Sequence, residues 1–208
     1  MAHVTAEVGH PETSTGLDNR KLMMWLFLAS ECLFFGGLIA TYLLYRDQSE
    51  TPPFPIDKTV NGVEYQGVFD IPFTSVSAFV LLMSSVAMVL ALSAIQRGDR
   101  RGTQIWLLAT ALLGMSFLAG QAFEFTEFYR EGLTLSTNLF GTSFFVLTGF
   151  HGAHVSVGVL ILLSLYIRGA QGKLGPEQSL NVELAGLYWH FVDVVWIVIF
   201  TLVYLIQT

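Results

Sequence analysis

Polar side chains, most of them carboxylic acids and histidines, lie inside long apolar stretches of this sequence. They are Glu31, Gln121, Glu124, Glu127, His151, His154, Glu183, His190 and Asp193. Side chains of these types can exchange protons, ligate a metal ion or haem, or bind one another. Such groups are costly to place in an apolar medium, so each is a candidate functional residue.

Glu31 is the most isolated of them, in the segment Leu28-Ala29-Ser30-Glu31-Cys32-Leu33-Phe34-Phe35. It lies about ten residues into its apolar stretch, which corresponds to roughly 15 Å along a helix. One interpretation is a carboxyl group that exchanges protons. The other is a protonated glutamic acid that is hydrogen-bonded to a neighbouring helix. The residues alone do not decide between them.

The other polar residues recur at helical spacing, which places each group on one helix face. Gln121, Glu124 and Glu127 follow one another at intervals of three, and so do His151 and His154. Glu183 and His190 are seven apart, with Asp193 three residues further on.

Three kinds of site fit this polar spacing: pairing between helices, contact with lipid headgroups, or a metal or haem site. The Glu-x-x-His string of di-iron bundles is absent from these apolar stretches,. Haem ligation by His151, His154 or His190 needs no such motif. We expect an interhelical polar network of Gln121, Glu124, Glu127, His151, Glu183, His190 and Asp193.

The elements that must position these residues are five apolar segments, each long enough to cross a bilayer as a helix of about 20 residues. They predict helices over 20–46, 71–97, 102–130, 138–168 and 181–206. With 53% hydrophobic and 12% charged residues, the chain has too little polar sequence to wrap five apolar helices as a soluble protein,. The predicted fold class is therefore all-α: a polytopic membrane protein with a bundle of five transmembrane helices.

This membrane domain covers residues 20–208 and follows a polar tail, residues 1–19. The lone cysteine, Cys32, excludes an internal disulfide and a CxxC motif,. The third loop, 130–137, is short, so the third and fourth helices should be antiparallel neighbours.

The basic residues divide unequally between the two ends of the predicted bundle. Seven of the ten lie at one end: Arg20, Lys21, Arg97, Arg100, Arg101, Arg168 and Lys173. The other end has Arg46, Lys58 and Arg130 beside an acidic first loop. The positive-inside rule then predicts a cytoplasmic N-terminus and a C-terminus outside.

Four strings, taken together and in this order along 20–206, resemble subunit III of the haem–copper respiratory oxidases, the cytochrome c and quinol oxidases. They are Ser30-Glu31 with Phe34-Phe35; Gln121-Ala122-Phe123-Glu124 with Glu127; Phe140-Gly141-Thr142-Ser143-Phe144-Phe145 leading to Gly149-Phe150-His151-Gly152-Ala153-His154-Val155 and Gly158; and Tyr188-Trp189-His190-Phe191-Val192-Asp193-Val194-Val195-Trp196. The chain is similar to the five-helix bacterial form, which lacks the first two helices of seven-helix members. The resemblance therefore does not imply, for this chain alone, the lipid-holding cleft that those two helices form in seven-helix members.

The resemblance implies a non-redox accessory subunit of a proton-pumping terminal oxidase in the aerobic respiratory chain, in the bacterial plasma membrane. Haem and copper would lie in partner subunits, with no cofactor or metal in this chain. The implied partners are subunit I as main contact, subunit II, further small or donor-complex subunits and structural phospholipid, with no nucleic acid. Glu31 matches the carboxylate linked to proton uptake, whereas His154 and Arg168 match positions associated with lipid headgroups.

Other functions stay open at this point, namely a subunit III-like component of a nitric oxide reductase and a free-standing membrane transporter. The sequence does not distinguish cytochrome c from quinol as electron donor, nor does it indicate the haem type of the partner. The loop 51–70 has no role that the resemblance assigns.

Overall fold

Five long α-helices make up most of the part of the chain that the structure describes, residues 18–46, 48, 51–60 and 62–206. The structure is a computed structural model. The helices are α1 (Asn19–Tyr45), α2 (Ile71–Gln96), α3 (Arg100–Arg130), α4 (Leu139–Ala170) and α5 (Ser179–Phe200). Each lies in a segment long and apolar enough to cross a membrane. The prediction of an all-α polytopic bundle with five transmembrane helices is confirmed.

Short polar side chains fix where four of these helices begin. The side chains of Asp18, Asp70, Asp99 and Asn138 accept hydrogen bonds from backbone N–H groups in the first turns of α1 to α4. Such caps satisfy donors that a helix start leaves without a partner. The Asp99 cap explains why α3 begins at Arg100, two residues before the predicted boundary.

The two ends of the chain differ in detail from the prediction. The last helix, predicted over 181–206, starts two residues earlier as α5, directly after a 3₁₀ turn (Pro176–Gln178), and it ends in a π-helical turn (Thr201–Leu205). Residues 1–17 of the predicted tail lie outside the described residues, and Asn19 already belongs to α1.

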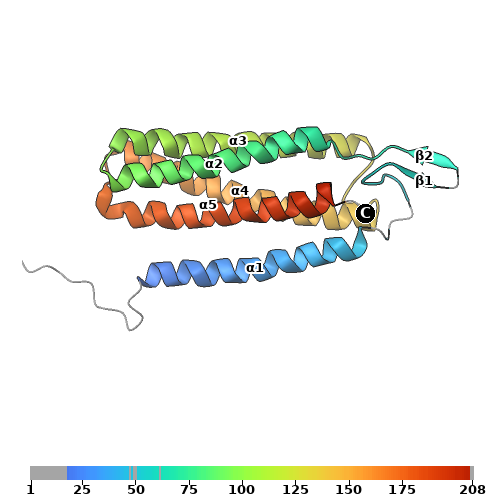
Figure 1. The fold of residues 1–208 in the computed structure, drawn as a ribbon, viewed down its shortest axis with the longest axis horizontal. Helices are drawn as coiled ribbons and strands as arrows, with labels where there is room; N and C mark the ends of the chain where they lie inside the picture. Colours follow the sequence, from blue (N-terminus) through green and yellow to red (C-terminus); the bar gives the residue numbers. More distant parts are fainter. Residues whose placement is uncertain (1–17, 47, 49–50, 61, 207–208) are drawn as a thin grey trace, which may run out of the picture.

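The helices alternate in direction, and α1 lies to one side of the group formed by α2 to α5 (Figure 1). Consecutive helices α2 and α3 pack together, as do α3 and α4, and α5 closes the group against α2 and α4. The third and fourth helices are therefore the antiparallel neighbours that the short loop predicts. The main contacts of α1 are with α4 and α5.

Polar contacts hold α1 at both of its ends. Lys21 Nζ lies 2.7 Å from Glu183 Oε1 near the start of α5. At the other end, Arg46 Nη1 donates to the carbonyl of Ile206, 2.8 Å away.

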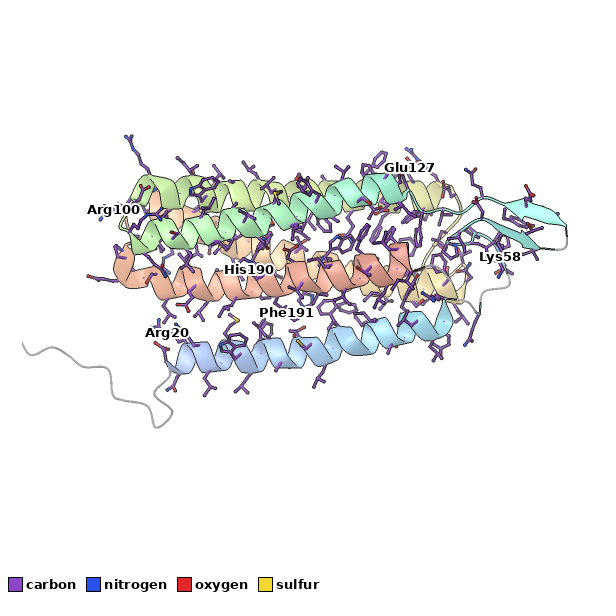
Figure 2. All side chains as sticks on the ribbon, in the orientation of Figure 1. Arg20, Lys58, Arg100, Glu127, His190 and Phe191 are labelled. Carbon is purple, nitrogen blue, oxygen red and sulfur yellow. The ribbon has the colours of Figure 1, made fainter. Side chains whose placement is uncertain are left out.

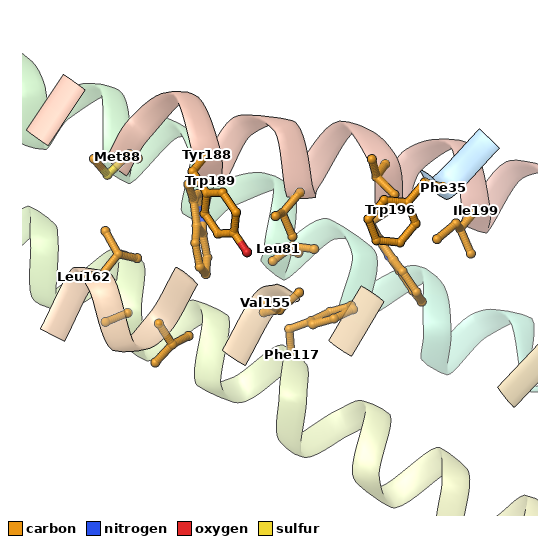
Figure 3. Packing of buried hydrophobic residues seen from close by; sticks show 14 of the residues in the cluster. Phe35, Leu81, Met88, Phe117, Val155, Leu162, Tyr188, Trp189, Trp196 and Ile199 are labelled. Carbon is orange, nitrogen blue, oxygen red and sulfur yellow. The ribbon is translucent and has the colours of Figure 1, made fainter. Parts of the chain in front are cut away.

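Aromatic side chains of α5 fill the centre of the α2–α5 group (Figure 3). Trp189 is 1% exposed and its Nε1 donates to Ser84 Oγ of α2 at 2.9 Å. Its ring lies against two glycines, because a Cβ added at Gly114 would lie 2.5 Å from the ring and one added at Gly158 would lie 2.7 Å away. These glycines let α3 and α4 approach the indole closely.

The first loop contains a short hairpin that hydropathy does not predict. β1 (Lys58–Val60) pairs antiparallel with β2 (Val63–Tyr65), and the hairpin projects beyond the helix ends (Figure 1). Phe54, 2% exposed, packs edge-on against Tyr65 with ring centroids 5.7 Å apart. Asn138 Nδ2 donates to the carbonyls of Thr51 and Pro53, which joins the loop to the start of α4.

Candidate functional site

Glu31 and His154 meet midway along α1 and α4. Glu31 Oε2 lies 3.2 Å from His154 Nε2, and both side chains are about one-fifth exposed, at 18% and 19%. Their contact joins α1 to the rest of the bundle between the polar contacts at its two ends. The carboxyl group that the sequence singled out therefore has an imidazole as its partner.

Further hydrogen bonds orient His154. Its Nδ1 lies 2.7 Å from the carbonyl oxygen of Phe150, one turn earlier on α4. The hydroxyl of Tyr188 on α5 donates to the backbone carbonyl of His154 at 3.0 Å. The rings of Phe34 and Phe35 flank the imidazole, with centroids 6.2 and 5.0 Å away.

An apolar cleft of about 650 Å³ between α1, α4 and α5 contains this pair. Glu31, His154 and Tyr188 line it toward the middle of the helices, and Ser164 and Asn181 line it near the end where α4 stops and α5 starts. The other lining residues are apolar: Met24, Phe27, Phe150, Ala153, Val157, Ile161, Leu165, Leu184 and Ala185.

Arg168, the second residue that the resemblance associates with lipid, is exposed near the end of α4. It lies fourteen residues after His154, or about 21 Å along the helix axis. His154 lines the cleft and Arg168 does not. The two residues are therefore not brought together around one small site.

Gln121 and Glu124 of α3 form a buried polar cluster with neighbouring helices. Glu124 Oε1 accepts hydrogen bonds from Thr74 Oγ1 of α2 at 2.6 Å and from the hydroxyl of Tyr204 at 3.2 Å. Gln121 Nε2 donates to the carbonyl of Thr148 on α4 at 2.9 Å. Both residues therefore form hydrogen bonds to neighbouring helices.

Glu127, the third residue of the same stripe, has no hydrogen bond to another helix among the residues that the structure describes. Its carboxylate lies 2.6 Å from Arg130 Nη1 of its own helix, with 40% of its side chain exposed. Partial burial and the nearby Glu127 charge raise the pKa of Glu131, just past the end of α3. Figure 2 shows Glu127 at the end of the bundle that carries the hairpin, away from Arg20 and Arg100.

Asp193 and His190 of α5 share a serine of α2. Ser85 Oγ donates to Asp193 Oδ2 at 2.6 Å, and His190 Nδ1 lies 3.2 Å from the same oxygen of Ser85. Because the single hydroxyl proton of Ser85 goes to Asp193, His190 Nδ1 donates to Ser85. Glu183, predicted for the same network, pairs instead with Lys21 at the end of α1.

His151 is fully buried among aromatic rings, apart from the predicted network. It stacks on Trp196 with centroids 4.9 Å apart and lies edge-on to Phe117 at 5.9 Å. Among the described residues, neither of its ring nitrogens has a hydrogen-bond partner. In the same described residues, no three His, Cys, Asp or Glu side chains are grouped so as to hold a metal ion.

The chain was compared with models of known protein families, and one of them matches almost all of it. The model of the family described as "Cytochrome c oxidase subunit III" matches residues 5–208. The chain belongs to this family.

Curated relatives cover most of the chain and of their own length. A cytochrome c oxidase subunit 3 of Bacillus sp. (strain PS3) is 38% identical over 197 residues, 94% of this chain and 90% of the relative. A cytochrome c oxidase subunit 3 from a Synechocystis species is 42% identical over 199 residues, which are 95% of this chain and 78% of the relative. A quinol oxidase subunit 3 of Bacillus subtilis is 36% identical over 184 residues, which are 88% of this chain and 85% of the relative.

Sequence reasoning missed the partners that complete these sites in this subunit III family member. They are Lys21, Thr74, Ser85, Thr148, Tyr188 and Tyr204. Serine and threonine are common in apolar helices and often bond to their own helix, as Ser75 does to the Ile71 carbonyl, so their presence does not indicate a partner on another helix,. The helical stripe of Gln121 and Glu124 was the one signal that a partner should face it.

Proposed function

We propose that this chain is the non-redox accessory subunit III of a proton-pumping haem–copper terminal oxidase in the aerobic respiratory chain. The observation that carries the proposal is the family match over 5–208. Relatives named as subunits of cytochrome c and quinol oxidases support membership of an oxidase complex.

In this proposal the chain packs beside the subunit that holds haem and copper, subunit I, within a complex that also contains subunit II. Glu31, in contact with His154 midway along the bundle, is the residue through which the chain influences proton uptake. A mid-membrane carboxyl with a defined partner is typical of proton-linked sites and supports this role. The chain itself would carry out no redox step.

In the same proposal, a structural phospholipid binds in the cleft between α1, α4 and α5. Its apolar walls suit an acyl chain, and Ser164 and Asn181 offer polar groups near one end. Arg168 at the end of α4 would bind phosphate independently, because the charged fork of arginine suits phosphate oxygens. His154 faces the acyl region and Glu31, so the headgroup role falls to Arg168 and the polar end of the cleft.

We place the protein in the bacterial plasma membrane, with the N-terminal end of α1 in the cytoplasm. The basic residues Arg97, Arg100 and Lys173 lie in loops or helix starts at the same end of the bundle as the start of α1. The positive-inside rule supports this orientation.

Removing this chain from the purified oxidase tests the accessory role. We expect the remaining complex to keep its haem spectrum and its initial rate of O₂ reduction, while its activity falls faster during turnover. A loss of haem in proportion to the removed chain would overturn the proposal, since it would place a redox centre in this subunit. Unchanged long-term activity and proton delivery would also contradict it.

A further inference from the structure

The hydrogen bonds of His154 determine where its protons lie. Nδ1 is 2.7 Å from the carbonyl oxygen of Phe150, and a carbonyl oxygen can only accept a hydrogen bond,. Nδ1 therefore carries a proton. Only Nε2, which faces Glu31 at 3.2 Å, can change its protonation state without breaking that bond,.

Two arrangements satisfy the contact between Nε2 and Oε2. A protonated Glu31 can donate to a bare Nε2, or a protonated Nε2 can donate to the Glu31 carboxylate. With no proton between them two acceptors would face each other, and with two protons two donors would do so. Each satisfactory arrangement has one proton between the two atoms.

We propose that Glu31 and His154 form a single proton-binding unit, in which His154 Nε2 and Glu31 Oε2 share one proton. When the proton moves, the O–H bond of Glu31 breaks and the Nε2–H bond of His154 forms. The neutral acid and neutral imidazole then become a carboxylate and an imidazolium. The use of this unit in proton uptake rests on the proposed function, whereas the sharing itself rests on the geometry.

The surroundings favour the one-proton state of the Glu31–His154 unit. Both of its arrangements have zero net charge, whereas gaining or losing a proton would leave an unpaired charge among apolar residues. The titratable groups that interact electrostatically with the unit are Tyr188 of α5, bonded to the His154 carbonyl, and His151, one turn earlier on α4. Neither is hydrogen-bonded to the Glu31 carboxyl group in the described structure.

The unit also opens into the cleft, since both residues line it. The pair therefore lies at the wall of the cleft and not inside the buried core of the α2–α5 group. His154 is in this view the proton partner of Glu31, which is a different role from the lipid-headgroup contact that its sequence position implies.

Infrared difference spectroscopy of the oxidase, purified through this chain, tests the inference. Spectra recorded as a function of pH in H₂O and D₂O, wild type minus Glu31→Gln, isolate the Glu31 carboxyl signal. We expect His154→Gln, which keeps a polar group but cannot take up a proton, to shift the frequency of that signal and its pH midpoint. His190→Gln, a histidine substitution outside the pair, should leave both unchanged.

A second variant keeps the inference testable if His154→Gln does not assemble. Glu31→Asp retains the carboxyl but withdraws it by one methylene from Nε2, so its carboxyl signal should show a similar displacement in pH midpoint. A carboxyl signal from position 31 with the wild-type frequency and pH midpoint in His154→Gln, or with the wild-type pH midpoint in Glu31→Asp, would overturn the shared proton. Failure of the chain to copurify with haem would instead contradict the proposed function, and the infrared signal of the pair would be unaffected.

Discussion

A carboxyl group in the middle of a membrane-spanning helix costs several kcal/mol unless it is protonated or paired. In this chain Glu31 of α1 is paired with His154 of α4 at 3.2 Å, and the pair lines an apolar cleft. Replacement of Glu31 should therefore affect proton uptake and release more than it affects the packing of the helices.

We expect Glu31→Gln to assemble normally, because the amide keeps the shape of the side chain and can still bond to His154. Proton-linked turnover of the oxidase should fall, since an amide cannot release or take up a proton at this position. Steady-state O₂ reduction, proton ejection and the rate of inactivation during turnover would be measured together. Wild-type values for all three would reduce Glu31 to a packing residue.

The buried cluster around Glu124 makes a separate prediction about stability. Thr74→Val removes the 2.6 Å hydrogen bond to Glu124 and leaves Tyr204 as the remaining donor that the structure gives this carboxyl. We expect a loss of about 1 to 2 kcal/mol, because a buried acceptor loses a partner. The midpoint of thermal inactivation of the complex should therefore decrease.

Thr126→Val is the matched control for Thr74→Val. Thr126 is exposed on α3, and its hydroxyl donates to the Ala122 carbonyl of its own helix. Its replacement should change stability by less than about 0.5 kcal/mol. Equal effects of the two substitutions would count against a stabilising role for the contact between Thr74 and Glu124.

At the scale of single residues, the sequence identified the acidic and histidine members of the sites but not how they pair. Glu31 and His154 were assigned different roles because their contact depends on how α1 lies against α4, which neither segment encodes by itself. His151 and His154 share helical spacing, yet the structure buries one among aromatic rings and turns the other toward the cleft. The seven-residue spacing of Glu183 and His190 likewise did not bring them together.

Among the elements, the helices and the antiparallel packing of α3 against α4 were predictable, whereas the position of α1 was not. The bilayer sets the length of an apolar helix, so hydropathy places five helices within a few residues. The lateral position of α1 was not predictable, because helices that are apolar on all sides carry little signal about which face is buried. The hairpin of β1 and β2 was missed because strands of three residues give too short an alternation to recognise.

Close packing of α4 against Trp189 gives a prediction at the scale of the helices. A Cβ added at Gly158 would lie 2.7 Å from the indole ring, so Gly158→Ala must displace the ring or separate the helices. Overpacking of a well-filled core costs about 1 to 3 kcal/mol, and we expect the inactivation midpoint to fall accordingly.

Gly149→Ala provides the control on the same helix. A Cβ added there meets nothing within 4 Å, and alanine is the better helix former by about 0.8 to 1 kcal/mol,. This variant should be as stable as the wild type or more so. If Gly158→Ala were as stable as the wild type, α4 and Trp189 could not be packed as tightly as in this structure.

For the whole molecule, the charges at the two ends of the bundle predict its orientation in the membrane. Lys58 in the hairpin and Lys173 after α4 are both exposed and lie at opposite ends. A membrane-impermeant amine reagent applied to cells without an outer barrier should label Lys58 and leave Lys173 unlabelled until the cells are opened. Mass spectrometry of the labelled peptides would detect this, and the reverse pattern would mean that the N-terminal end of α1 faces outward.

The central claim is that this five-helix chain works beside a partner subunit that holds the redox metals. Its most direct test is to solubilise the native membrane under mild conditions, purify through a tag on this chain, and measure the optical spectrum with haem, copper and polypeptide content. We predict haem and copper in fixed ratio to this chain and O₂-reducing activity in the same fractions. A colourless preparation of this chain alone, or metal that stays with this chain after its partners are removed, would contradict the account.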